Sequence, residues 1–511
     1  MKRKLTTLSE IIITVILLIS CSLVGTAQSV DVPFSRDKMK KDLEIFKQIR
    51  IQANSGLYKY RSKQEIDSIY IWAENEIELS NSYLDFYNII CQLTDFEGSC
   101  HNDTSLPKKR LDALSEEERG YFPYPLKWVN GKWRINYETG EIPLGSAIIE
   151  INTMPIDKVM QNLYKYYTTD GINLTGKRIG LRRHFSKYYR WNFGQTDTFS
   201  VKFTKPNSEL VESQTIIGVG YKQCYKHVQS RHSRPYDTKY YTTLAPNQKY
   251  KYQQVNSITG LFTINDFSIG GNEDAAEHKI YRTFLDSIFK SIKSNELKNL
   301  IVDVRINGGG TDPNDVVTYS YLTSRKFQES KQVWISFQKL PFLKYYDSPI
   351  PRFIRPLGVG RYNKIFKNRF PNEKDGKYYM SKNESEMMVR TPNELNFTGN
   401  IYLLISPAVG SAGSLFAALV AGNENTITIG EETLGGYYGH NGHVPLEYVL
   451  PKSKLGIRFF MENIEQDVPV KNNQLKGRGV MPDYPVSQSL EDFLNNQDTQ
   501  MRFVLELIKA H

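Results

Sequence analysis

The chain has 511 residues, of which 40% are hydrophobic, 12% aromatic and 23% charged, with a formal net charge of +10. This composition is typical of a folded protein and excludes a disordered chain or a fibrous repeat. The length predicts about three domains at roughly 150 residues each, and the mildly basic charge is not that of a nucleic-acid-binding protein.

The first 27 residues are typical of an export signal, because a Lys-Arg-Lys cluster precedes an apolar run over residues 11–19. Two cleavage sites are readable. Residues 18–21 resemble a bacterial lipobox that would place a lipid on Cys21, which is slightly favoured, and residues 25–27 suit ordinary signal peptidase. A membrane-spanning helix needs about 20 apolar residues. We therefore expect an exported protein of the bacterial periplasm or cell envelope, which is either soluble or attached to a membrane only through a lipid on Cys21.

Residues 28–119 are expected to form an N-terminal helical region, because apolar side chains recur there at three- and four-residue steps. Residues 120–215 carry short apolar runs separated by turn signals, such as Asn130-Gly131, and predict a small β-rich domain.

Strand and helix patterns alternate in residues 216–511 after a Tyr- and Lys-rich connector, which predicts a parallel sheet with helical crossovers. An insertion is expected at residues 325–395. Residues 339–377 within it are basic and aromatic. Such a patch would be suited to binding nucleic acid. An exported protein seldom encounters nucleic acid, so we interpret the insertion as a lid or an envelope contact.

Apart from Cys21, the cysteines are Cys91, Cys100 and Cys224, without a CxxC pair. This pattern indicates neither a disulfide framework nor a zinc ribbon. One disulfide is possible, for instance between Cys91 and Cys100.

Ser411 follows an apolar strand at residues 401–405 and precedes a helical pattern that begins at Ala412. A serine at a helix N-terminus lies beside free backbone N–H groups that can stabilise an oxyanion. The alternative is that Ser411 only caps the helix, and taken alone this alternative is favoured.

Glycines 308–310 directly follow another buried strand, so the backbone there can approach a ligand closely or direct N–H groups at negative charge. A phosphate cradle is the weaker interpretation, since neither GxxxxGK[ST] nor GxGxxG is present.

Four segments together resemble the C-terminal processing (tail-specific) serine peptidases. They are residues 303–310 (DVRINGGG), 405–416, 430–436 (GEETLGG) and 479–483 (GVMPD), in the order found in that family. Residues 142–156 also resemble its PDZ-like segment. The resemblance implies a crotonase/ClpP-like α/β peptidase core of βαβ units. It also implies Ser411 as nucleophile, with an oxyanion hole formed by the N–H groups of Ala412 and Gly309.

The sequence differs from one branch of the family at the position of the catalytic base. Members with a Ser-Lys dyad carry lysine at the position of Gly436, and Lys452 and Lys454 are expected at the surface. Residues 97–104 resemble the histidine segment of the other branch, similar to the tricorn protease core, and so imply His101 as base.

The orienting acid of that branch falls near Lys476 here. Glu432, Glu447 and Glu462 stay open as candidates, and Ser99 is an alternative means of holding the imidazole.

His440 and His443 in the following loop form an HxxH pair. They are a possible substitute base or metal pair, but a metal site needs at least a third ligand, and we interpret the loop as a wall of the active site. A cysteine-protease reading through Cys100 is not favoured, because neighbours in sequence do not ordinarily form a catalytic pair. No metal or other cofactor is expected.

The sequence therefore predicts an exported serine endopeptidase that cleaves extended or C-terminal segments of peptides or unfolded proteins through an acyl-enzyme on Ser411. The PDZ-like domain would hold the substrate by strand addition. One alternative is a catalytically inactive protein of the same fold that binds peptides or envelope components. A glycan-binding role for the basic insertion rests on composition alone.

Overall fold

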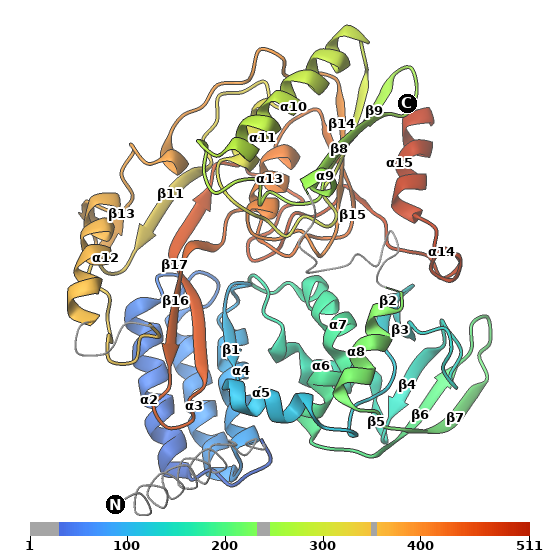
Figure 1. The fold of residues 1–511 in the computed structure, drawn as a ribbon, viewed down its shortest axis with the longest axis vertical. Coiled ribbons are helices and arrows are strands. Elements are labelled where there is room, and N and C mark those ends of the chain that lie inside the picture. Colours follow the sequence, from blue (N-terminus) through green and yellow to red (C-terminus); the bar gives the residue numbers. More distant parts are fainter. Residues whose placement is uncertain (1–29, 232–245, 349–354, 511) are drawn as a thin grey trace, which may run out of the picture.

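The computed structural model describes residues 30–231, 246–348 and 355–510 (Figure 1). The expected export signal, including Cys21, lies outside the described residues. Within these ranges, none of the helices has the length and apolar character needed to cross a membrane.

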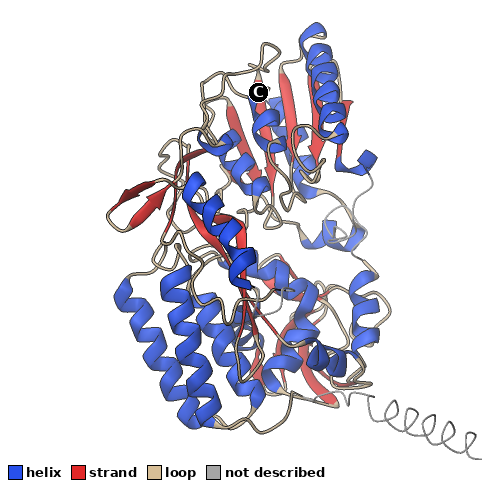
Figure 2. Ribbon diagram, turned by 60° about the vertical axis from the view of Figure 1, so that its left-hand side comes forward, coloured by secondary structure: helices blue, strands red, loops and turns tan. Residues whose placement is uncertain are grey.

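The N-terminal region is helical, as predicted, and its helices lie side by side (Figure 2). Two of these helices begin with a capping box, Ser62 with Glu65 and Ser82 with Asp85, which satisfies backbone N–H groups at each start. The helices are α2 (Arg36–Ala53), α3 (Lys63–Leu79), α4 (Tyr83–Phe96) and α5 (Lys108–Ser115), and the short strand β1 (Asp103–Ser105) follows α4.

The middle of the chain forms an antiparallel sheet in the order β2-β3-β4-β6-β7, with β5 beside β4. Its strands are β2 (Leu126–Val129), β3 (Lys132–Ile135), β4 (Ala147–Ile151), β5 (Met154–Pro155), β6 (Thr198–Thr204) and β7 (Val211–Ile217). The helices of this part are α6 (Ile156–Leu163), η1 (Tyr164–Tyr166), α7 (Leu174–Phe193) and α8 (Tyr221–Gln229). The 20-residue helix α7 was not among the predicted elements, which here were short strands alone.

The third part is the predicted α/β core, with the sheet order β18-β15-β14-β10-β9-β8. Strands β9, β10, β14, β15 and β18 run parallel, and β8 is antiparallel to β9. The strands are β8 (Tyr250–Gln254), β9 (Thr259–Ile264), β10 (Asn299–Asp303), β14 (Asn400–Ile405), β15 (Thr426–Gly430) and β18 (Tyr484–Pro485). The helices are α9 (Pro246–Lys249), α10 (Ala276–Ser294), α11 (Asn314–Ser320), α13 (Ala412–Ala421), α14 (Leu490–Asn495) and α15 (Thr499–Ala510). Since the parallel strands share one direction, the loops after β10 and β14 meet at one edge of the sheet.

A further sheet has the order β1-β17-β11-β13-β12, with β16 also paired to β17. Its remaining elements are β11 (Ser330–Ile335), α12 (Arg355–Arg369), β12 (Asn372–Lys374), β13 (Lys377–Tyr379), η2 (Ser385–Met387), β16 (Asn441–Val449) and β17 (Gly456–Gln466). The expected insertion at 325–395 thus contributes β11 to the middle of a sheet. One hydrophobic core also joins the N-terminal helices, the middle domain and β17.

The three described cysteines are all free thiols. The disulfide that the sequence left possible between Cys91 and Cys100 is therefore not formed. Cys91 is buried in α4, whereas the Cys100 sulfur lies 3.6 Å from the Nδ1 atom of His101.

A buried ion pair fixes the end of α4 against α2. Arg50 is fully buried and donates through Nε to Glu97 Oε1 at 2.8 Å, and Glu97 is 3% exposed. Asn54 and Asn102 donate to the other carboxylate oxygen at 3.0 and 2.9 Å. Glu97 therefore connects α2 to the loop that carries His101.

We expect Glu97→Ala to lower the free energy of unfolding by about 3–5 kcal/mol, because it leaves the Arg50 guanidinium buried without its partner. Urea unfolding monitored by circular dichroism measures this change. Glu78→Ala is the matched control, since Glu78 pairs with Lys40 at the surface and its loss should cost less than about 1 kcal/mol. Equal effects for the two variants would contradict the expectation.

Candidate active site

Ser411 lies at the start of α13 in a strained backbone conformation, with φ 50° and ψ −132°. The side chain makes no capping hydrogen bond to the helix, so the interpretation that Ser411 only caps α13 is wrong. A non-glycine residue with this φ is uncommon and costs conformational energy. The same strain between a strand and a helix is typical of a nucleophile elbow, where it exposes the serine hydroxyl.

Gly309 packs directly against this serine. Its φ is +113°, and a Cβ atom at position 309 would lie 2.7 Å from the Cβ of Ser411 and 3.1 Å from the backbone nitrogen of Ala412. Only glycine therefore fits. The Gly309 N–H donates to Asn307 Oδ1 at 2.9 Å, so this predicted oxyanion donor is engaged within its own loop in this conformation.

The charged residues of the first motif hold the loop in place. Arg305 contacts Asp303 through two hydrogen bonds of 2.9 and 2.7 Å, and Asp498 through two more of 2.7 and 2.9 Å. These side chains attach the end of β10 to the segment before α15, and they have a structural role.

Residues 434–436 connect the nucleophile to the histidine loop. The Leu434 N–H donates to the carbonyl of Val409 at 2.9 Å, two residues before Ser411. The Gly436 N–H donates to Asp170 Oδ2, also at 2.9 Å. The other oxygen of Asp170 accepts the Cys100 N–H at 2.9 Å. Asp170 thus joins the loop of His101 to the segment that contacts the nucleophile, and no motif in the sequence had indicated it.

The His101 ring lies beside Phe460 of β17 and beside His440, which directly precedes β16, with centroid distances of 4.4 and 5.1 Å. Burial lowers the pKa of His101 to about 4, although a hydrogen bond with the backbone of Asn441 opposes the shift; nearby Arg458 lowers the pKa further. The imidazole is therefore neutral near pH 7, which is the form that can accept a proton.

The three candidate acids have other partners. Glu432 accepts from Arg478 at 2.7 Å and from the Gly479 N–H at 2.9 Å. Glu462 accepts from His443 at 2.7 Å, and Glu447 lies 3.4 Å from Arg458. Among the contacts described, none of these carboxylates pairs with His101.

The family's lysine position corresponds to Gly436 in this chain, and the position of its acid lies near Lys476. A Cβ atom at Gly436 would lie 2.8 Å from the carbonyl oxygen of Gly439 and 3.3 Å from the hydroxyl of Tyr60. The backbone therefore leaves no room for a lysine there. Lys476 is exposed. Lys452 and Lys454 lie in the turn between β16 and β17 and are both exposed, as predicted.

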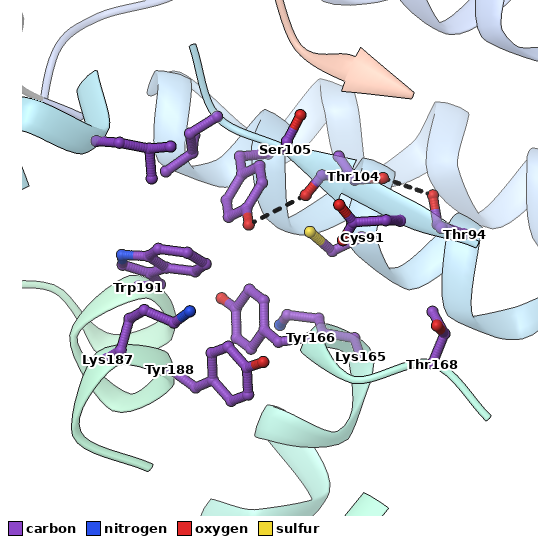
Figure 3. Close-up of a pocket in the computed structure, with 14 residues that line it drawn as sticks. Cys91, Thr94, Thr104, Ser105, Lys165, Tyr166, Thr168, Lys187, Tyr188 and Trp191 are labelled. Carbon is purple, nitrogen blue, oxygen red and sulfur yellow. Dashed lines mark hydrogen bonds between the residues drawn. The ribbon is translucent and has the colours of Figure 1, made fainter. Parts of the chain in front are cut away.

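A cavity of about 220 Å³ opens beside β1, which begins two residues after His101 (Figure 3). Figure 3 shows Lys187 and Trp191 of α7 facing Thr104 and Ser105 of β1. Burial lowers the pKa of Lys187 to about 8, while the nearby Asp103 raises it. Aromatic side chains line the cavity together with Lys165, Lys187 and Asp103.

Comparison with known proteins agrees with this geometry. Residues 259–486 match the model of peptidase family S41. The core is an S41 peptidase domain. The match covers nearly the same residues as the four motifs, and it identifies the chain as a serine-type peptidase.

The S41 fold extends beyond the core. The crystal structure of mature CPAF is similar with a TM-score of 0.57 and 12% identity, covering 92% of this chain and 96% of that one. A CPAF serine-to-alanine mutant gives a TM-score of 0.61 at 12% identity, over 90% and 95% of the two chains. Mature CPAF complexed with lactacystin gives 0.55 at 13% identity, over 93% and 98%. A search among curated proteins finds no match.

The depressed pKa of His101 gives a prediction for folding. Between about pH 4 and 6.5 the unfolded chain binds a proton at residue 101 that the folded protein does not. Stability should therefore fall as the pH drops through this window, by about 2–3 kcal/mol from this group. His101→Gln should remove that part of the slope when unfolding is followed at pH 4.5 and 7.

The NMR titration of the His101 ring supplies the direct check, with the His101→Gln spectrum as the assignment control. A midpoint near pH 6.5 would show that the ring is solvated and contradict the expectation.

Proposed function

We propose that this S41 peptidase is an exported serine endopeptidase that cleaves extended or C-terminal peptide segments through an acyl-enzyme on Ser411, with His101 as base. The observation that carries the proposal is the strained, uncapped Ser411, connected through residues 434–436 and Asp170 to the loop of His101.

In the proposed reaction the hydroxyl oxygen of Ser411 attacks the scissile carbonyl, and His101 takes the hydroxyl proton. The carbonyl oxygen becomes an oxyanion and accepts the N–H of Ala412, at the positive end of α13. Collapse of the intermediate expels the amine, which takes the proton from His101. Water then attacks the ester with His101 as base, releasing the acid and restoring the serine.

Gly309 would supply the second donor of the oxyanion hole by exchanging its hydrogen bond with Asn307 for one to the oxyanion. This exchange is local, because the glycine already packs against Ser411. The donor would thus be engaged internally until a substrate carbonyl arrives.

Two observations support histidine over lysine as the base. The space at position 436 is closed by the backbone of Gly439 and by Tyr60. The His101 ring is neutral near pH 7 and has a hydrogen bond with the backbone of Asn441. That backbone group would orient the imidazole in place of a carboxylate, since the acid position near residue 476 holds a lysine.

The middle domain is the part proposed to bind the substrate by strand addition. Strand β7 is at the edge of its sheet, and its end residues Val211 and Ile217 are 53% and 67% exposed. An open edge strand of this kind can pair with an extended peptide. This supports the expected PDZ-like role of residues 120–215.

A catalytically inactive peptide-binding protein is the second candidate. It is favoured by the lysine at position 476 and by the engaged N–H of Gly309. The two candidates, an active peptidase and an inactive peptide-binding protein, lead to opposite predictions for the same variants.

We expect purified residues 28–511 to hydrolyse an unfolded, C-terminally labelled protein. Ser411→Ala and His101→Ala should each lower kcat/KM by at least about 10³-fold, because each removes a group that acts in the transition state. Ser487→Ala is the control, since Ser487 is exposed, and should retain full activity.

Loss of activity in Ser411→Ala alone would reject His101 as base. If the wild type cleaves nothing over a broad panel of unfolded proteins, while Ser411→Ala binds them as well as the wild type does, the inactive binder is correct.

Asp170 is proposed as a positioning residue. Asp170→Asn keeps the shape but turns an NH₂ group toward one of the two backbone N–H donors. We expect kcat to fall about 10- to 100-fold with KM nearly unchanged, because the link between the His101 loop and residues 434–436 loses one of its two hydrogen bonds. A raised KM with unchanged kcat would instead place Asp170 in substrate binding.

A further inference from the structure

A second cluster of ionisable side chains lies beyond the glycine run, on the side of α11 and β11. Asp312 is three residues past Gly309, Asp315 is in the first turn of α11, and Glu329 immediately precedes β11. One carboxylate oxygen from each of the three acids lies within 4.8 Å of the other two. Two segments of the chain therefore bring three acids to one point.

Two of these acids have carboxylate oxygens without a hydrogen-bond partner among the described residues. Asp315 is fully buried, and neither of its oxygens has a hydrogen-bond partner among the described residues. Glu329 is 2% exposed, and its Oε1 atom is also without one. Buried charges are normally paired or coordinate metals, so these oxygens indicate a missing ligand.

His443 lies at the edge of this cluster, beside Glu329. Its Nδ1 atom is held by Glu462 Oε2 at 2.7 Å. Its Nε2 atom is buried, has no hydrogen-bond partner among the described residues, and lies 3.7 Å from Glu329 Oε1. A carboxylate on one ring nitrogen, with the other nitrogen directed at acidic oxygens, is the arrangement that orients metal-binding histidines.

The charged side chains around the cluster also favour a bound cation. Glu386 and Glu462 flank the cluster, and the basic side chain described beside them is Arg369, which contacts both and also Glu384. Arg369 is thus shared among acids on one side. Asp312, Asp315 and Glu329 repel one another with no arginine or lysine among their described ion pairs.

We propose that Asp312, Asp315, Glu329 and the Nε2 atom of His443 bind a divalent cation, which nothing in the peptidase reaction requires. Oxygen and imidazole ligands together favour Mn²⁺ or Zn²⁺ over Mg²⁺ and Ca²⁺, which take oxygen ligands. The spread of the oxygens suits this class, since ligands on opposite sides of a cation lie about 4–5 Å apart. Closure of the site around the ion would order the loop that carries Gly309.

The test begins with the wild-type protein stripped by EDTA and dialysed. Titration calorimetry with Mn²⁺, Zn²⁺, Ca²⁺ and Mg²⁺ should give one site per chain for Mn²⁺ or Zn²⁺, with at least tenfold weaker binding of the other two. The melting temperature should rise with the concentration of the bound cation.

Asp315→Asn is the decisive variant because the proposal predicts two opposite effects on the melting temperature, one without the cation and one with it. It should melt at a higher temperature than the stripped wild type, since it removes one of three acids whose oxygens lie within 4.8 Å of one another, and it should lose the cation-dependent rise in melting temperature. Asp375→Asn is the matched control. It changes an exposed aspartate in the turn between β12 and β13 and should bind the cation like the wild type.

His443→Gln should weaken cation binding about 10- to 100-fold. The proposal is overturned if none of the four cations binds the stripped wild type at millimolar concentration, or if Asp315→Asn binds as tightly as the wild type. These readouts do not depend on peptidase activity, so they stand whether or not Ser411 is catalytic.

Discussion

The position of the proposed base depends on one buried ion pair, between Arg50 and Glu97. Glu97 closes helix α4, and the carboxylate that holds α2 through Arg50 also accepts from Asn102, the residue after His101. Asp170 holds the same loop from the other side. The two acids accept from fixed amide, guanidinium and backbone donors, so the loop is confined from both sides before any substrate binds. Preorganisation of this kind is what a catalytic group needs, because a small misplacement costs rate.

The buried carboxylates of this protein differ in their hydrogen-bond partners. Glu97, Asp170 and Glu432 each accept several N–H or O–H donors, and their charge is balanced locally. Asp315 and Glu329 lie at comparable depth with oxygens that accept nothing. The first three acids thus have hydrogen-bond donors, whereas the acids beyond the glycine run have oxygens without one. That contrast supports the proposed cation site.

Local patterns allowed much of the fold to be predicted, and long-range pairings account for what was missed. The periodic helices, the parallel core and the position of Ser411 follow from residues close together in the sequence. Helix α7 was missed because its many Lys and Arg side chains hide the apolar period. They are buried through partners far away, as Arg190 is with Glu117. Asp170 was missed for the same reason, since its partners lie 70 and 266 residues away.

The missing lysine of the Ser-Lys branch is connected to the N-terminal region. Tyr60 donates to the carbonyl of Gly439, and Lys59 donates to that of Ile464, so this turn fills the space beside Gly436. A longer side chain at position 436 would have to displace it. The N-terminal region thus closes the place from which a lysine would act and also carries His101. The exclusion of a lysine at position 436 and the packing of this region against the core are, in this protein, two consequences of a single arrangement.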